Sequence, residues 1–421
     1  MSQKKGRICV FFRVYNDTDH LSPVAWRLLR EGYSVDAVLI DKNQALDPER
    51  DPRLSLLRGL EGCRMYTYYS SVAGLGFLKN FCLARLRNSP ARKIAKKILS
   101  LMDRFIFSQS WADKFIGSRR PAACIFDPCE TSLNTLEGKL IAACKKNNVP
   151  LVCLPHGAHF LTSYGEGSEQ SQAVKSEDYF RSRDVFDVIV EPNPRHELGA
   201  WDRKLVEQNK IRFLGSARYC PEWFALARNF WPDFKPAKSD AGKLKVVFFL
   251  PRWEKTVNRE GVLKILEALA YDENIYLAVK EHTREGAGNL PAELYSKLDD
   301  SKNTERILGS AVDSVALVRW CDAAVNIRGS IGLEVILQEK ILINPKYLHK
   351  GRTIFEDNGA GIECRSFEEF LAVVERCRFA KEKPVSFYDS SALIKNSVYA
   401  GKEPVDVLST YTELVASLQR E

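Results

Sequence analysis

The sequence predicts an α/β protein with two Rossmann-like domains that face each other across a cleft, followed by an amphipathic C-terminal helix. Three observations predict this fold. Uniformly apolar, strand-like runs alternate with helical patterns, as in parallel sheets that are covered on both faces. The same rhythm restarts after a segment rich in proline and charge at 231–243. The 421 residues also suffice for two separate hydrophobic cores.

The first domain is predicted to span residues 1–235. Short apolar runs predict buried strands, at 7–12, 34–40, 122–126, 150–154, 185–191 and 211–214. Helical patterns lie between them, at 22–31 and 136–147, and residues 72–116 read as mostly helical around Pro90. Gly32 stands where a glycine would end the first helix, and Arg13 to Asp19 are predicted to form a loop.

The second domain is predicted to span residues 244–404, and the C-terminal helix residues 405–421. Its strands are expected at 245–250, 275–279, 323–327 and 341–344, and its helices at 261–270, 314–320, 331–339 and 367–377. Ligands of parallel α/β sheets bind outside the carboxyl ends of the strands. Two such sheets across one cleft would therefore suit a reaction between two substrates, with one held by each domain.

Composition and charge favour certain classes of binding partner and one cellular location. The net charge of +8 favours an anionic partner, such as a nucleotide phosphate, an acidic sugar or a membrane surface. No recognition-helix, zinc-finger or RNP pattern supports nucleic acid. The 11 cysteines are scattered without a CxxC pair, so we expect reduced, buried thiols. With no signal peptide and no apolar run of ~20 residues, the sequence favours a cytoplasmic location.

The strongest motif is the run from Asn326 to Asn344, which reads strand, Arg-Gly-Ser, helix, strand. Gly329 would let the backbone come close to a ligand, and Ser330 would cap the helix whose N-terminus attracts anions. Glu334 would accept hydrogen bonds from a pair of ribose or sugar hydroxyls. Alternatively, Ser330 only caps the helix and Glu334 only compensates the helix dipole.

Cationic side chains follow the strands of the second domain. Lys280 and His282 end one predicted strand, in the segment VKEH, and are candidates for binding phosphate. Arg252 and Arg328 follow two other strands and would add positive charge to the same side of the cleft. The alternatives are a strand-end histidine with structural partners and ordinary surface charges in solvent.

In the first domain, Asp127, Glu130 and His156 stand at or just after strand ends. Direct transfer of a group to an acceptor hydroxyl needs one base to take the proton of that hydroxyl. We consider His156 first and Asp127 second, although His156 would also suit a purely structural contact between loops. Asp17 and Asp19, in the loop after the first strand, are weaker candidates.

Two further features bear on chemistry and location. No DxD between strands and no His/Cys cluster is present, so we expect no metal site. Walker A, GxGxxG and GxSxG motifs are also missing, which argues against NTPases, dehydrogenases and hydrolases. The stretch from Lys79 to Phe107 interleaves basic and apolar residues, which is typical of a helix on anionic lipid or of a helix pair with a solvated basic face.

Five short segments, in this order, resemble GT-B glycosyltransferases of bacterial capsule, O-antigen and teichoic-acid assembly. They are LPHG at 154–157, LGSARYCPEW at 214–223, VKEHTRE at 279–285, the Asp313-Ser314 pair, and the stretch from Asp322 to Pro345. The resemblance covers about the whole chain. It departs from the family pattern at Ala217 and Thr283, where that family has proline.

This resemblance implies a metal-independent glycosyltransferase without a cofactor other than its nucleotide-sugar substrate. The cationic second domain favours an acidic or phosphate-rich donor such as a CMP-linked acidic sugar, with a UDP-sugar or a CDP-polyol as alternatives. The acceptor would be a surface glycan or a lipid-linked precursor of capsule or lipopolysaccharide. Gly215, Ser216 and Arg218 would lie at the hinge or in the cleft. The alternatives are an isomerase like UDP-sugar 2-epimerases, a CDP-polyol phosphotransferase of the same fold, or a non-catalytic partner in glycan assembly.

Overall fold

The computed structural model describes most of the chain. The described residues are 5–40, 46–67, 107–155, 157, 160–163, 183–194, 206–251, 253, 257–282, 290–309, 311–379 and 387–419. His156, Arg252 and the basic stretch from Lys79 onward, apart from its last residue Phe107, lie outside these ranges. In the described part of the chain, no helix has the length and apolar character needed to cross a membrane.

The first domain is a seven-stranded sheet in the order β3-β2-β1-β4-β5-β7-β8. Its strands are β1 (Arg7–Phe12), β2 (Ser34–Leu39), β3 (Cys63–Thr67), β4 (Ala123–Phe126), β5 (Leu151–Cys153), β7 (Val188–Glu191) and β8 (Ile211–Phe213). All neighbours pair in parallel. Helices cover the sheet: α1 (Tyr15–Arg30), α2 (Pro52–Gly59), α5 (Gln109–Arg119) and α6 (Leu136–Lys146). Separate apolar clusters line its two faces, which explains why these strands are apolar throughout.

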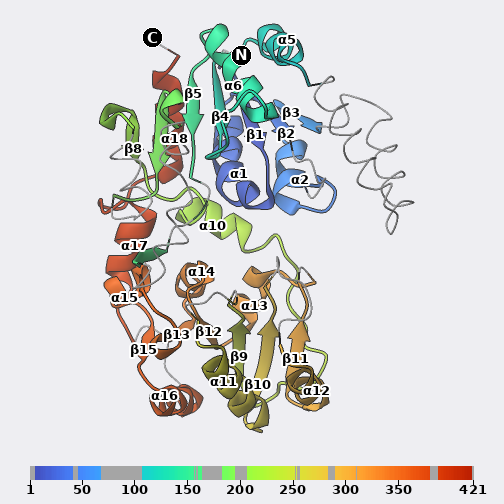
Figure 1. The fold of residues 1–421 in the computed structure, drawn as a ribbon, viewed down its shortest axis with the longest axis vertical. Helices are drawn as coiled ribbons and strands as arrows, with labels where there is room; N and C mark the ends of the chain where they lie inside the picture. Colours follow the sequence, from blue (N-terminus) through green and yellow to red (C-terminus); the bar gives the residue numbers. More distant parts are fainter. Residues whose placement is uncertain are drawn as a thin grey trace, which may run out of the picture.

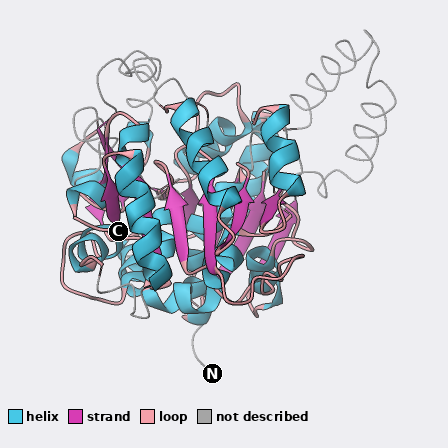
Figure 2. Cartoon of the chain, turned by 90° about the horizontal axis from the view of Figure 1, so that it is seen from below, coloured by secondary structure: helices cyan, strands magenta, loops and turns pink. Residues whose placement is uncertain are grey.

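The second domain repeats this plan with a six-stranded parallel sheet in the order β11-β10-β9-β12-β13-β15. Its strands are β9 (Leu244–Phe249), β10 (Ile275–Lys280), β11 (Thr304–Ile307), β12 (Ala323–Asn326), β13 (Ile341–Pro345) and β15 (Ile362–Cys364). Its helices are α11 (Arg259–Tyr271), α12 (Ala292–Asp300), α13 (Ser314–Trp320), α14 (Ile331–Leu337), α15 (Ile354–Asp357), α16 (Phe367–Phe379) and α17 (Ser391–Val398). Figure 1 shows the two sheets one above the other, and Figure 2 shows helices on both sides of the strands. The predicted fold class is confirmed.

The beginning of α1 corrects one prediction. The segment expected as a loop, Arg13 to Asp19, is mostly the first turn of this helix, which starts at Tyr15 rather than at Ser22. The buried carboxylate of Asp17 causes the early start, because its Oδ2 accepts hydrogen bonds from the backbone amides of Arg13 (2.7 Å) and Val14 (2.9 Å). Helix α1 therefore begins directly behind the carboxyl end of β1.

The two domains meet through a shared helix, α10 (Pro221–Ala227). Its neighbouring residues Trp223 and Phe224 belong to different hydrophobic clusters, the first to the core of the first domain and the second to the core of the second. A small antiparallel sheet adds a second contact, in which β6 (Leu161–Ser163) pairs with β14 (Arg352–Thr353). The orientation of the domains is thus fixed by packed side chains as well as by the linker.

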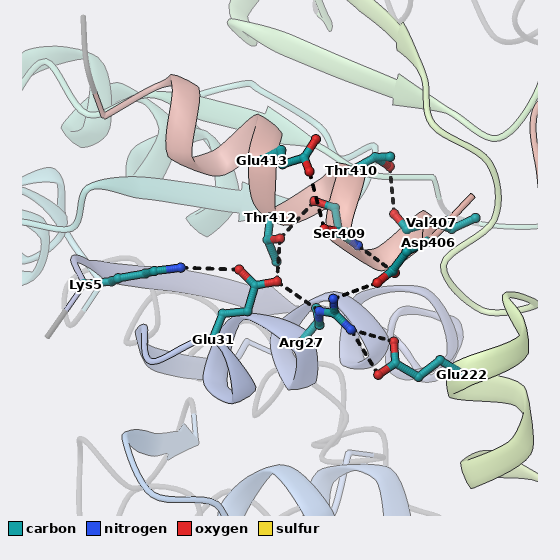
Figure 3. Close-up of polar contacts among 10 residues, drawn as sticks. All are labelled: Lys5, Arg27, Glu31, Glu222, Asp406, Val407, Ser409, Thr410, Thr412 and Glu413. Carbon is teal, nitrogen blue, oxygen red and sulfur yellow. Dashed lines mark hydrogen bonds and ion pairs between the residues drawn. The ribbon is translucent and has the colours of Figure 1, made fainter. Parts of the chain in front are cut away.

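The last helix, α18 (Val407–Ser417), returns to the first domain after α17 has packed on the second. Its buried face, which includes Tyr411, joins the core of the first domain. Arg27 of α1 fastens it from outside, because its guanidinium bonds Asp406 at 2.7 Å and Glu222 at 2.8 Å (Figure 3). The division at residues 235, 244 and 404 stays a prediction, but α18 itself packs as part of the first domain.

The chain that returns to the first domain crosses the segment after β8 at Gly215. The amide of Ser216 donates to the carbonyl of Val398 (2.9 Å), and the Tyr411 hydroxyl donates to the carbonyl of Gly215 (2.8 Å). Gly215 has a φ of +85°, and a Cβ there would lie 2.2 Å from the Val398 carbonyl oxygen. Only glycine permits this close crossing.

We therefore expect Gly215→Ala to lower the free energy of unfolding by roughly 3 kcal/mol or more, because backbone strain and steric overlap combine. Gly32→Ala is the matched control, since Gly32 has a φ of +87° but nothing within 4 Å of the added Cβ. It should cost about 1 kcal/mol from the left-handed conformation alone. Equal losses for both variants in urea denaturation would contradict the crossing described here.

Candidate functional site

The interface between the domains collects charged side chains from the carboxyl ends of both sheets. Asp19 lies on α1 behind β1, and Arg218 follows β8. From the second domain come Asp313, which caps α13, and Glu334, which lies on α14 behind β12. The strand ends of the two domains therefore face each other, which is the arrangement that the sequence predicts for the binding site.

Arg218 connects the two domains at this interface. Its Nη1 lies 2.8 Å from Oδ2 of Asp19, and its Nη2 lies 3.5 Å from Oε2 of Glu334. On the other side, Asp19 pairs with the guanidinium of buried Arg53, which also bonds Asp51 at 2.6 Å. The result is a chain of alternating charges that runs from α2 through α1 into the second domain.

Glu334 is the most perturbed carboxyl group of this chain of charges. Its residue is 4% exposed, and its Oε2 accepts no hydrogen bond, because the contact with Arg218 is too long for one. Burial raises the pKa of Glu334 to about 7, and Asp19 and Asp313 act in the same direction while Arg218 opposes them. A buried carboxylate with spare acceptor capacity suits a ligand that brings hydroxyl donors.

The turn before α14 is stabilised by the side chain of Asn326 and not by that of Ser330, which was the predicted cap. Ser330 occupies the N-cap position of α14, but its hydroxyl makes no capping hydrogen bond, which corrects the prediction. Instead, Nδ2 of buried Asn326 donates to the carbonyl of Gly329 (2.8 Å). A Cβ on Gly329 would lie 2.4 Å from Oδ1 of Asn326, so the tight turn requires glycine. Arg328 within it has a φ of +54°.

The two candidates after β10 differ in their placement. Lys280 is 4% exposed, and its ammonium donates to the carbonyl of Gly309 rather than pointing into solvent. Burial lowers the pKa of Lys280, with Asp313 and Glu281 opposing that effect. His282 follows the strand and is partly exposed. Because an ammonium has three N–H donors, a contact between Lys280 and phosphate would use a donor that is not bonded to the Gly309 carbonyl.

Among the base candidates of the first domain, Asp127 lies directly after β4 and is 2% exposed. Arg13 holds both of its oxygens, with Nε 3.1 Å from Oδ1 and Nη2 2.5 Å from Oδ2. Glu130 lies in the exposed loop that follows. Asp17 has the capping role described above, which makes it a poor base. His156 lies outside the described residues.

A small pocket opens at the same edge of the first sheet. It brings together Gly157, from the segment LPHG, and Ser216, from the segment after β8, and it is also lined by His20 of α1. The remaining lining residues are Pro155, Pro192, Ala217 and Tyr411. Two segments that are separate in sequence thus meet in one hollow, next to Gly215 and Arg218.

The sequence did not indicate several residues of this site. Arg13 belongs to the segment predicted as a loop after β1 and His20 directly follows that segment, so their position after a strand was a usable signal. Arg53 and Asn326 gave no comparable signal. Arg53 lies on α2, 34 positions after its partner Asp19 in the sequence. Asn326 bonds the carbonyl of Gly329, within the turn that follows it.

The raised pKa of Glu334 predicts how stability depends on pH. Between its ordinary pKa of 4.5 and about 7, the folded chain keeps a proton that the unfolded chain has released. Raising the pH through this window therefore removes stability from the wild type but not from Glu334→Gln. We expect the unfolding free energy of Glu334→Gln relative to wild type to rise by about 2 to 3 kcal/mol from pH 5 to pH 8.

Urea denaturation at both pH values measures this difference. Glu363→Gln, at an exposed position of β15, is the control and should show the same difference from wild type at both. A difference for Glu334→Gln that does not change with pH would mean that Glu334 titrates like an ordinary surface carboxyl group.

Comparisons with known proteins agree on the fold. No protein-family model matches the sequence, and no curated protein matches it either. Among solved structures, a Listeria monocytogenes protein assigned as a UDP-N-acetylglucosamine 2-epimerase has a TM-score of 0.59 at 10% identity, covering 98% of this chain and 96% of its own. The UDP-GlcNAc 2-epimerase from Neisseria meningitidis, solved with bound UDP-GlcNAc, has a TM-score of 0.55 at 10% identity, over 99% and 100% of the two chains.

A third similar structure is a transferase. The glycotransferase of kitacinnamycin has a TM-score of 0.50 at 13% identity and covers 99% of this chain and 96% of its own. At such low identities these similarities concern the fold alone. They show that this chain has the two-domain GT-B type of architecture along its whole length.

Proposed function

We propose that this protein is an enzyme that binds a nucleotide-activated sugar between its two domains and transfers the sugar to an acceptor. The observation that carries the proposal is Glu334, a buried carboxylate at the domain interface whose Oε2 lacks a hydrogen-bond donor. Hydroxyl groups of a ribose would supply such donors. The epimerase from Neisseria meningitidis, which has a similar fold, was solved with a nucleotide sugar, UDP-GlcNAc.

On the donor side, the turn from Arg328 to Ser330 would face the phosphates, and Arg328 would offset their charge. Gly329 allows the backbone to approach closely, since its turn is already closed by Asn326. His282 follows β10, which is separated from β12 by β9 in the sheet. It would donate a further hydrogen bond to the phosphates. Arg252, in the loop after β9, is a further proposed contact that lies outside the described residues.

On the acceptor side, a base would take the proton of an acceptor hydroxyl while its oxygen forms a bond to the anomeric carbon. The bond from that carbon to the donor phosphate breaks, and the nucleotide leaves with the bonding electrons. His156 and Asp127 remain the proposed bases, with Glu130 as a weaker one. The pair with Arg13 keeps Asp127 in a fixed orientation at the carboxyl end of β4.

A second reaction is favoured by the structural comparisons. Several similar structures are described as UDP-GlcNAc 2-epimerases, so isomerisation of the sugar of a UDP-sugar is the alternative to transfer. Both reactions need the same nucleotide site but differ in their products. An acceptor is consumed in transfer, whereas isomerisation needs none and leaves the nucleotide attached.

Incubation with a panel of UDP-, CMP- and CDP-linked donors separates these reactions. We expect release of free nucleotide that increases with an acceptor glycan, because transfer breaks the donor bond. A sugar isomer that stays linked to its nucleotide would establish the epimerase reaction instead, and neither product with any donor would favour a non-catalytic partner. We propose that turnover needs no metal or other cofactor, so EDTA should leave the rate unchanged.

Variants that keep their fold but lose turnover identify the base. We expect His156→Ala or Asp127→Asn to lower kcat by roughly 10²- to 10⁴-fold, since a general base contributes about that much. Donor affinity in calorimetry should stay within a few-fold of wild type. Glu363→Gln again serves as the control. If both variants melt like wild type and turn over within a few-fold of it, the base must be sought at Glu130 or His20.

The acceptor and the location are further proposals. We propose a surface glycan or a lipid-linked precursor as the acceptor, because the sequence resembles enzymes of that class. The basic stretch from Lys79 to Phe107 supports peripheral contact of a cytoplasmic protein with an anionic membrane, which flotation with anionic liposomes would test. Liposomes that do not retain the protein at low salt would remove this part of the proposal.

A further inference from the structure

Among the described residues, Glu334 has one ion-pair partner, Arg218, which lies on the segment after β8 of the first sheet. The same guanidinium also pairs with Asp19 and lies over the ring of Tyr219, with 4.9 Å between the guanidinium carbon and the ring centroid. Asp19 thus holds the cation from the first domain, whereas the ring of Tyr219 packs in an apolar cluster of the second domain. The position of a positive charge beside Glu334 therefore depends on how the two domains are placed.

The contact between Arg218 and Glu334 supplies charge without supplying a hydrogen bond. At 3.5 Å, Nη2 is beyond ordinary hydrogen-bond distance from Oε2, and that oxygen accepts no other bond in the described part of the chain. The acceptor capacity of Glu334 is thus left for a ligand. A cation that made two short bonds would have occupied about half of the lone-pair sites of the carboxylate.

We propose that Arg218 is a positioning residue that reaches across the domain interface to keep the Glu334 carboxylate ionised and oriented for the hydroxyl pair of a nucleoside. This inference rests on the proposed function, because it assigns the nucleoside to Glu334. It adds that recognition of the hydroxyl groups requires both domains, since the carboxylate and its counter-ion come from different ones.

The charges that face Glu334 determine its response to pH. Asp19 and Asp313 raise the pKa of Glu334, and Arg218 is the cation that lowers it, against the larger effect of burial. Without Arg218, the two aspartates and burial remain, so the pKa of Glu334 must rise above its value of about 7. At neutral pH the variant would then carry a protonated and weaker acceptor.

The test compares Arg218→Met with wild type in calorimetric titrations, using the nucleoside diphosphate that binds wild type best and its 2′,3′-dideoxy analogue. We expect Arg218→Met to lose about tenfold or more in affinity for the hydroxylated nucleotide at pH 7. Its affinity for the dideoxy analogue should equal that of wild type. The midpoint of the increase in affinity with pH should move upward, and Arg218→Lys should bring it back toward the wild-type midpoint.

Arg27→Met is the matched control. The Arg27 side chain is 20% exposed and that of Arg218 is 21%. Arg27 also pairs with several carboxylates, those of Glu31, Glu222 and Asp406 (Figure 3), but it has no ion pair with Glu334 among the described residues. This variant should bind both nucleotides like wild type, with the same pH midpoint. Thermal melting of both variants shows whether they are folded at the temperature of the titrations.

Three results would overturn the inference. If Arg218→Met binds the hydroxylated nucleotide like wild type, Arg218 does not act on Glu334. Equal losses for the hydroxylated and dideoxy nucleotides, with an unchanged pH midpoint, would assign Arg218 to general folding or charge. If wild type itself binds no nucleotide, the proposed function fails, and the inference fails with it.

Discussion

The guanidinium of Arg218 makes it possible for acidic groups of both domains to meet in a buried interface. Asp19, Asp313 and Glu334 converge there from α1, α13 and α14, and without a cation their mutual repulsion would add to the cost of desolvation. Arg218 and Arg53 offset that cost from the first domain. The contact between the domains at this point and the environment of Glu334 therefore depend on the same ion pairs.

The segment that carries Arg218 is also where the chain joins its two halves. Gly215 allows the returning C-terminal segment to cross at Val398, and α10, directly after Arg218, anchors one side chain in each core. A rotation of one domain against the other would have to move this segment. The cation beside Glu334 is thus placed on a segment that contacts both domains.

Hydrophobic periodicity was sufficient to predict the central strands, such as β1, β9 and β12, because strands buried on both faces are apolar at every position. It failed at elements whose start or conformation depends on a single polar contact. The early start of α1 depends on the carboxylate of Asp17, and the turn before α14 depends on Asn326 rather than on Ser330. The ion pairs of Arg218 join residues 199 and 116 positions apart, which no local pattern encodes.

The most direct test is a crystal structure of the protein with the nucleoside diphosphate that binds it best. The account predicts ribose hydroxyl oxygens within about 2.6 to 3.2 Å of the Glu334 carboxylate. It also predicts that Arg218 still lies beside that carboxylate and remains paired with Asp19. A nucleotide bound elsewhere, or one whose ribose does not touch Glu334 while the domains keep this arrangement, would contradict the central claim.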